Sequence, residues 1–236
     1  MKKSFVLGLL ASVLIFTLGF ASINVTAARA AGMGPNQGGS SQPGANILAL
    51  PASALSAQES AALIFMIEEE KLARDVYTGL YSTWKLPIFQ NIAAAEQKHM
   101  DELALLLNRY NLVSPVKSAG VFTDPKLQDL YNSLMVQGKS SLAAALKVGG
   151  AIEEIDILDL QTRSTQSDSA DILQAYTNLL NGSYNHLRAF SNTLASQAGG
   201  TYAPQYMNTS QYQAALANTG SAGVRPTWAG KGQARP

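Results

Sequence analysis

Glu96 and His99 stand three residues apart, inside a stretch with the apolar periodicity of a helix. At 3.6 residues per turn their side chains are about 60° apart around the helix axis, so they project to the same side. That side also carries apolar residues such as Phe89 and Leu103. Burying an ionised carboxylate without a partner costs several kcal/mol, and a cation bound by both groups offsets that cost. The pair therefore predicts part of a metal site.

Further candidate ligands lie on two other segments with helical periodicity. Glu70 shares the apolar side of the first segment, and Glu69 is the second choice there. Glu153 and Asp156 are three residues apart on the next segment and share its apolar side, with Glu154 as the reserve candidate. Each segment therefore offers one or two carboxylates that can face a common core.

The second histidine, His186, lies in the apolar stripe of a fourth long segment. Facing helices of four-helix bundles build two-metal sites from Glu and Glu-x-x-His, and candidate ligands here fall on four helices. Imidazole with carboxylates suits iron or manganese, with zinc as a competitor, and we expect iron. Tyr77, two turns beyond Glu70, is expected to orient a ligand carboxylate by a hydrogen bond. The predicted metal ligands are Glu70, Glu96, His99, Glu153, Asp156 and His186.

Start and stop signals outline the helices that must position these residues. A capping box at Ser56 and Glu59 opens the first, and a glycine pair at 199–200 closes the fourth. The core helices are expected at about 57–82 and 87–110, then from Ser140 or Ser141 to about 163 and from Ser167 or Ser169 to the glycine pair, with a short crossover helix closed by Gly138. A C-terminal strap follows, and no strand pattern is evident. The Gly149-Gly150 pair within the third helix indicates either a close neighbour or a kink.

Composition favours one globular domain with extensions. The chain has 236 residues, of which 47% are hydrophobic and 14% charged. Its balance of charge gives no nucleic-acid footprint and no basic membrane face. The absence of cysteine excludes disulfides, thiolate nucleophiles and iron–sulfur clusters. Redox chemistry would therefore need nitrogen and oxygen ligands.

The N-terminus has the pattern of a secretory signal peptide. Lys2 and Lys3 precede a long apolar run, and a small-x-small site predicts cleavage after Ala30. The alternative is an uncleaved membrane anchor, because the run is nearly long enough to span a bilayer. Export to the periplasm or outside the cell is expected, with no stable membrane domain after cleavage. The predicted divisions are a signal peptide at 1–30, a Gly/Pro/Ser-rich linker at 31–54, a helical domain at 55–217 and a loose tail at 218–236.

Three motifs resemble those of rubrerythrin-type members of the ferritin-like superfamily. EKLARDVY at 70–77 resembles the first-helix motif, EQKH at 96–99 the second, and EEID at 153–156 the paired acids of the third. Over most of 55–217 the chain is similar to a ferritin-like family catalogued as a domain of unknown function. The resemblance implies an all-α, ferritin-like four-helix bundle with a non-haem iron or related site.

One position departs from the pattern of these relatives. Their fourth helix usually carries Glu-x-x-His, whereas Ser183 stands three residues before His186. Either Asp156 or Glu154 supplies the missing carboxylate, or the site holds one metal tightly and a second weakly. The sequence leaves these alternatives open.

Three functional hypotheses follow from the predicted site. The first is an oxidase or peroxidase that reduces oxygen or peroxide with electrons from an external donor. The second is a protein that binds or sequesters iron without turnover. The third is a metal-free bundle whose acids pair with Arg74, Arg109 or Arg188. A homodimer is compatible with each of them.

Overall fold

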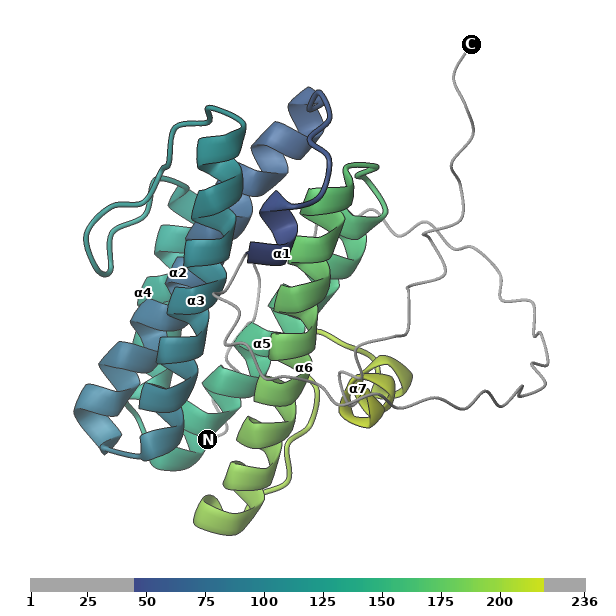
Figure 1. Ribbon diagram of the computed structural model, residues 1–236. Helices are drawn as coiled ribbons and strands as arrows, with labels where there is room; N and C mark the ends of the chain where they lie inside the picture. Colours follow the sequence, from purple (N-terminus) through teal and green to yellow (C-terminus); the bar gives the residue numbers. More distant parts are fainter. Residues whose placement is uncertain (1–44, 219–236) are drawn as a thin grey trace, which may run out of the picture. The chain divides into compact units, whose positions relative to one another are not determined.

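Residues 45–218 are described by a computed structural model, and within that range the chain forms seven helices and no strand. The predicted all-α class is confirmed for this part of the chain. The long helices α2, α3, α5 and α6 match the four that the sequence predicts (Figure 1). The helices are α1 (Ala45–Leu48), α2 (Ala57–Trp84), α3 (Pro87–Arg109), α4 (Pro125–Gly138), α5 (Leu142–Ser164), α6 (Ala170–Ala198) and α7 (Thr209–Ala217).

Local signals set the ends of the long helices. The Ser56 hydroxyl oxygen accepts a hydrogen bond from the Glu59 N–H at 3.1 Å, and Glu59 Oε2 accepts one from the Ser56 N–H at 2.9 Å. This capping box starts α2 as predicted. Pro87 is the first residue of α3. Gly199 ends α6 with a φ of 63°, in the left-handed region that glycine adopts without strain.

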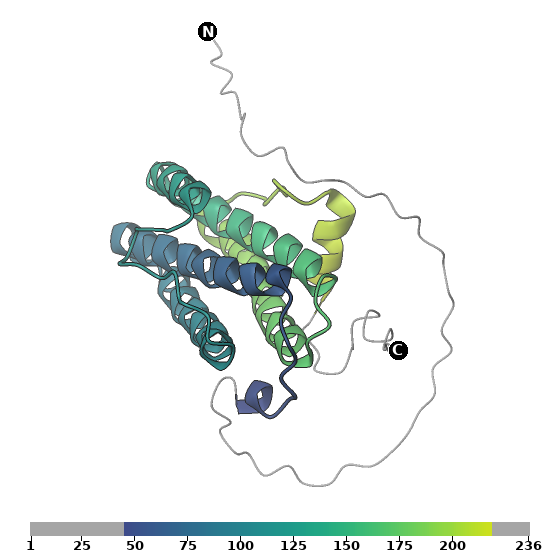
Figure 2. The same cartoon turned by 90° about the horizontal axis from the view of Figure 1, so that it is seen from above.

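The four long helices pack as a closed ring in which each contacts two others. α2 packs against α3 and α5, and α6 packs against the same two helices. Both views show the four helices side by side (Figures 1 and 2). One face of every long helix therefore points to a common centre, where residues distant in sequence meet.

Two apolar clusters fill this ring and leave a polar layer between them. On α2, Ile67 belongs to one cluster and Leu72 to the other, so Glu70 lies between the clusters. On α3 the two clusters follow in the reverse order along the chain: Ala93 shares a cluster with Leu72, and Met100 shares one with Ile67. Glu96 and His99 therefore also lie between the clusters. The polar layer at the middle of the helices is thus flanked by apolar side chains on both sides, which limits the access of water to it.

The Gly149-Gly150 pair is explained by the close approach of two aromatic rings. A Cβ placed on Gly149 would lie 2.5 Å from the ring of Phe190 in α6, and one on Gly150 would collide with the ring of Tyr202. Side chains larger than a hydrogen atom do not fit at either position. Close packing by a neighbour, one of the two explanations that the sequence left open, therefore accounts for the pair.

Two buried charged side chains of α2 bind the connection between α3 and α4. Lys71 Nζ donates to the Val121 carbonyl at 3.0 Å and lies 4.0 Å from the centroid of the Phe122 ring. Asp75 accepts a hydrogen bond from the Gly120 N–H at 2.9 Å and pairs with Lys71 at 2.6 Å. α4, which corresponds to the predicted crossover helix, then packs against both α2 and α5.

The segment between α6 and α7 crosses α5 where a strap is predicted. Glu154 of α5 is fully buried. Its carboxylate accepts hydrogen bonds from the Tyr202 hydroxyl and from the backbone N–H groups of Gln205, Tyr206 and Met207. Four donors stabilise this buried charge without a cation, and they fix the segment on α5.

The predicted linker differs from the structure at its C-terminal end. Residues 45–48 form α1, and Ile47 is fully buried. Arg109 donates hydrogen bonds to the carbonyl oxygens of Ile47 at 3.2 Å and of Leu50 at 2.7 Å. A composition rich in Gly, Pro and Ser predicts no fixed structure here, but these contacts with the ring of helices order the last residues of the segment.

The signal peptide predicted at 1–30 lies outside the described residues, as does nearly all of the tail predicted at 218–236. The domain predicted at 55–217 contains α2 to α7. Within the described range, no helix combines the length and apolar character that crossing a membrane requires.

Replacing Gly149 by alanine tests the close packing of α5 on α6. In an open helix this change would stabilise the fold by about 1 kcal/mol. Here the collision with Phe190 should instead lower the free energy of unfolding by about 1–3 kcal/mol, measured by chemical denaturation. Combining Gly149→Ala with Phe190→Leu should cost less than the sum of the single changes. A stabilised Gly149→Ala variant would contradict this packing.

Candidate metal centre

Glu70, Glu96 and His99 meet at the centre of the polar layer. Glu70 comes from α2, and α3 supplies Glu96 and His99 from one face because they are three residues apart. His99 Nδ1 lies 2.7 Å from Glu96 Oε2 and 3.1 Å from Glu70 Oε2. The three potential ligand atoms lie within 4.8 Å of one another, which is compact enough for one metal ion.

A second group of three shares the Glu96 carboxylate. Its other members are Glu153 from α5 and His186 from α6. His186 Nδ1 lies 2.9 Å from Glu96 Oε1 and 3.5 Å from Glu153 Oε2. Glu96 therefore presents one oxygen to each histidine. A carboxylate in this position can bridge two metal ions.

Several atoms of these groups are buried without a hydrogen-bond partner. They are Glu70 Oε1, Glu96 Oε1, His186 Nδ1 and Asp156 Oδ1. Although His186 Nδ1 and Glu96 Oε1 are only 2.9 Å apart, their orientation is not that of a hydrogen bond. Buried polar groups in proteins are almost always paired, so these unpaired atoms make the polar layer a candidate site for a cation. A cation between the imidazole and the carboxylate would satisfy both.

Burial and the neighbouring charges shift the pKa values of the carboxylates in the polar layer. Burial raises the pKa of Glu70 to about 7, despite the opposing influence of His99. Burial also raises the pKa of Glu153, and the charge of Glu96 adds to the rise. For Glu96 burial acts in the same direction, but His186 and His99 outweigh it and hold the pKa of Glu96 well below its usual value.

For the pKa values of the two histidines, burial and the neighbouring charges act in directions opposite to those for the carboxylates. Burial by itself lowers the pKa of His186, but Glu96 and Glu153 outweigh burial and raise it to about 10. Burial likewise opposes, and Glu96 and Glu70 raise, the pKa of His99. Without a metal, protons on the histidines supply part of the positive charge that this layer needs.

Neighbouring residues fix the positions of the groups. The Tyr77 hydroxyl donates a hydrogen bond to Glu153 Oε1 at 2.5 Å. Gly182 lets the His99 ring lie directly on α6, because a Cβ there would be 2.6 Å from the ring. Of the His99 and His186 side chains, 12% each is exposed, compared with 2% of the Glu70, Glu96 and Glu153 side chains. The histidines are thus the most exposed members of the two ligand groups.

Ser183 and Asp156 occupy the place where the fourth-helix carboxylate is expected. Asp156 Oδ2 accepts a hydrogen bond from the Ser183 hydroxyl, and the other carboxylate oxygen is buried and unpaired. Burial, with Glu70 and Glu69 nearby, raises the pKa of Asp156 well above its usual value. Asp156 belongs to neither compact group of three.

Glu154, the reserve candidate, lies on a different side of α5. Both of its oxygens accept hydrogen bonds from the segment after α6. The geometry therefore gives Glu154 a structural role, whereas Asp156 keeps a buried oxygen without a hydrogen-bond partner.

The three consecutive acids of α2 are all buried, which the sequence prediction did not anticipate. Glu68, which was not among the predicted ligands, accepts hydrogen bonds from the N–H groups of Thr123 at 2.6 Å and Asp124 at 3.0 Å. The three consecutive side chains point in directions about 100° apart, and all three are buried because α3, α5 and the α3–α4 connection surround α2. Two acids not chosen as ligands are thus also inside, and periodicity alone gives no signal for this.

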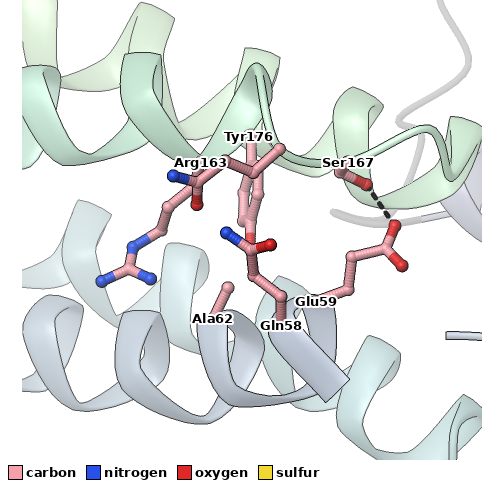
Figure 3. Close-up of a pocket in the computed structure, with 7 residues that line it drawn as sticks. Gln58, Glu59, Ala62, Arg163, Ser167 and Tyr176 are labelled. Carbon is pink, nitrogen blue, oxygen red and sulfur yellow. Dashed lines mark hydrogen bonds between the residues drawn. The ribbon is translucent and has the colours of Figure 1, made fainter. Parts of the chain in front are cut away.

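A separate hollow opens at one end of the ring, lined by Glu59, Ala62, Arg163 and Tyr176 among others (Figure 3). Ser167 donates a hydrogen bond to Glu59 there at 2.7 Å. Glu59 precedes Glu70 by eleven residues on α2, a rise of roughly 16 Å along a helix. The hollow is therefore distinct from the carboxylate–histidine groups.

Comparison with known proteins places the chain in a family. Residues 59–219 match the family described as an uncharacterized protein domain, DUF2202, and the chain belongs to this family. The uncharacterized protein MJ0754 of Methanocaldococcus jannaschii is 46% identical over 180 residues, which are 75% of this chain and 97% of the relative. The crystal structure of hypothetical protein MJ0754 from Methanococcus jannaschii DSM 2661 aligns with a TM-score of 0.69 and 47% identity. The alignment covers 72% of this chain and 97% of that one. The predicted membership of a family of unknown function is confirmed.

Substitutions at two adjacent acids separate the ligand role from the structural role. Glu153→Gln should reduce the metal bound by the group around His186, measured by elemental analysis after anaerobic loading with ferrous iron. Glu154→Gln should leave metal content unchanged, but it should lower the free energy of unfolding by about 1–3 kcal/mol, because its amide group faces backbone N–H donors. Loss of metal in the folded Glu154→Gln variant alone would reverse the two assignments.

Proposed function

We propose that this chain is a ferritin-like protein that binds two metal ions between α2, α3, α5 and α6. The observation that carries the proposal is the position of Glu96, whose two oxygens face two histidines in two overlapping ligand groups. Glu70 and His99 would complete one metal position, and Glu153 and His186 the other. Asp156 would add a carboxylate from α5.

The charges of the donor set fit two divalent cations. Glu70, Glu96, Glu153 and Asp156 carry four negative charges when ionised, and two divalent ions with neutral histidines would balance them. Buried carboxylates without such compensation are strongly unfavourable. The unpaired atoms of Glu70, Glu96, Asp156 and His186 would then all gain partners.

The metal-free alternative lacks the ion pairs on which it depends. Arg74 pairs with Asp75, and Arg109 pairs with Asp171 at 3.2 Å. Arg188 donates to the side chain of Asn185 and to backbone carbonyls near the end of α7. Within the described residues, none of these arginines has an ion pair with the carboxylates of the two ligand groups. This favours a bound cation over an arginine counter-ion.

Iron is the metal that we propose, with manganese and zinc as competitors. Bound iron supplies redox chemistry toward oxygen or peroxide, with electrons from an external donor. The chain's own residues would hold the ions through Nδ1 atoms and carboxylates, and Tyr77 would orient Glu153. The flanking apolar clusters would limit water, while His99 and His186, each with 12% of its side chain exposed, would give electrons a path to the metal.

We place this activity outside the cytoplasm, in the periplasm or beyond the cell, because the sequence predicts a signal peptide at 1–30. The relative in Methanocaldococcus jannaschii carries no named activity in its description, so the proposal rests on the site. Iron binding without turnover is the second candidate. The compact ligand set supports binding in both cases, and repeated addition of peroxide to the ferrous protein distinguishes them.

The shared position of Glu96 predicts which substitutions remove one ion and which remove both. Glu96→Gln should lose both metal positions, whereas His99→Ala or His186→Ala should each lose mainly one. The measurement is elemental analysis of protein loaded anaerobically with ferrous iron.

Glu102→Gln is the matched control for these changes. Glu102 is also a buried acid of α3, but its carboxylate is held by Asn178 at 2.6 Å. Its substitution should leave two ions bound. Wild-type protein that takes up no metal, or a Glu96→Gln variant with full metal content, would overturn the proposed function.

Metal uptake should release protons near neutral pH. With a pKa of about 10, His186 is protonated at pH 7 in the metal-free chain, and the raised pKa of His99 has the same consequence. Because a metal must displace protons from both Nδ1 atoms, at least two protons per chain should be released, and the ligand carboxyl groups with raised pKa values add to this number. Apparent affinity should therefore rise as the pH rises through the neutral range.

Titration calorimetry with zinc, in two buffers of different ionisation enthalpy, measures this release. The apparent binding enthalpy should differ between the buffers in proportion to the protons released. An enthalpy that does not depend on the buffer would contradict protonated histidines in the metal-free site.

A further inference from the structure

Three acids on α5 lead from the ligand groups toward the surface. Glu153, Asp156 and Asp159 are spaced by three residues, so they follow α5 in steps of about 4.5 Å along its axis, each turned by about 60° from the one before. Glu153 and Asp156 are buried, whereas 39% of the Asp159 side chain is exposed. The row thus runs from the buried ligand groups to a partly exposed acid.

Glu69 of α2 lies against the same part of α5. It is 5% exposed, and its Oε2 atom is buried without a hydrogen-bond partner. Glu69 lines a small hollow together with Ile152 and Ile155 of α5. Asp156 and Asp159 follow these two residues by four positions each, so they lie on the face of α5 that Glu69 meets.

The free carboxylate of Glu69 contrasts with the buried acids that have structural roles. Glu68 and Glu154 accept backbone N–H groups, and Glu102 accepts from Asn178. Glu69 and Asp156 each keep one buried oxygen with no partner. These two unpaired oxygens beside the candidate metal centre can bind a cation transiently.

Arg163 lies at the outer end of the row. Its guanidinium pairs with Asp159 at 3.4 Å and lies 4.5 Å from the centroid of the Phe65 ring on α2. Figure 3 shows this side chain extending from α5 toward α2. In this position Arg163 neutralises the outermost acid and opposes the approach of another cation.

We propose that divalent cations reach the metal centre between α2 and α5, through Asp159, Glu69 and Asp156 in turn. Arg163 holds Asp159 until an arriving ion displaces it. This inference rests on the proposed function, because it supplies the route by which that site is filled. On the opposite side the nearest buried acid, Glu102, is already bonded, so the α2–α5 side has the free carboxylates.

Stopped-flow measurement of cobalt(II) uptake by the metal-free, full-length mature chain tests the route. Visible absorption follows the loading rate, and elemental analysis gives the final content. Glu69→Gln should slow loading on the order of tenfold, and Asp159→Asn should slow it several-fold, because the local cation concentration falls with the charge. Arg163→Gln should accelerate loading.

Control variants separate the route from general effects of charge and folding. Glu102→Gln, a buried acid on the opposite side, and Asp129→Asn, an exposed acid on α4, should both load at the wild-type rate. Asp159 is partly exposed, so its substitution tests the route even if Glu69→Gln perturbs folding.

The outcomes distinguish the route from the function. Wild-type loading rates in Glu69→Gln and Asp159→Asn overturn the route while the metal centre stands. Loss of bound cobalt in folded Glu69→Gln makes Glu69 a ligand and also overturns the route. Failure of the wild-type chain to bind cobalt or ferrous iron overturns the proposed function, and the route with it.

Discussion

The structure depends on keeping the Glu96 carboxylate buried between two histidines. His99 and His186 each approach a different oxygen of Glu96, and they come from two helices that pack against each other. This arrangement requires α3 and α6 to lie close, which Gly182 permits at the His99 ring. The two apolar clusters on either side stabilise the ring of helices and so offset the cost of a charged layer at its centre.

Buried charges in this chain fall into two kinds. Glu68 and Glu154 are fully engaged with backbone N–H groups, and they fasten irregular segments onto α2 and α5. Glu70 and Asp156 retain unpaired oxygens inside the ring. The first kind stabilises the fold without a ligand, because hydrogen bonds replace the lost hydration. The second kind is unfavourable for the chain alone, which is the usual signature of a functional site.

The segment at 68–77 contributes both to the candidate metal site and to the stability of the fold. Within the segment at 68–77, Glu70 and Tyr77 contribute to the ligand groups, while Lys71 and Asp75 anchor the connection to α4. Side chains 100° apart reach different neighbours because α2 is enclosed on several sides. A substitution in this motif can therefore change either stability or the site, according to the direction in which its side chain points.

The sequence by itself determined the helices and the inward face of the Glu96–His99 pair, because capping residues and 3.6-residue periodicity are local properties. It also identified Glu70, Glu153 and His186 as inward residues. It ranked Asp156 above Glu154 as a ligand but did not show what engages Glu154, since those N–H groups come from residues 51 to 53 positions later. Nor did it show that Glu68 and Glu69 are buried or that Ser183 bonds to Asp156. Only tertiary packing decides which neighbour meets each face of a helix, and that neighbour determines whether a buried acid is satisfied or free to bind a cation.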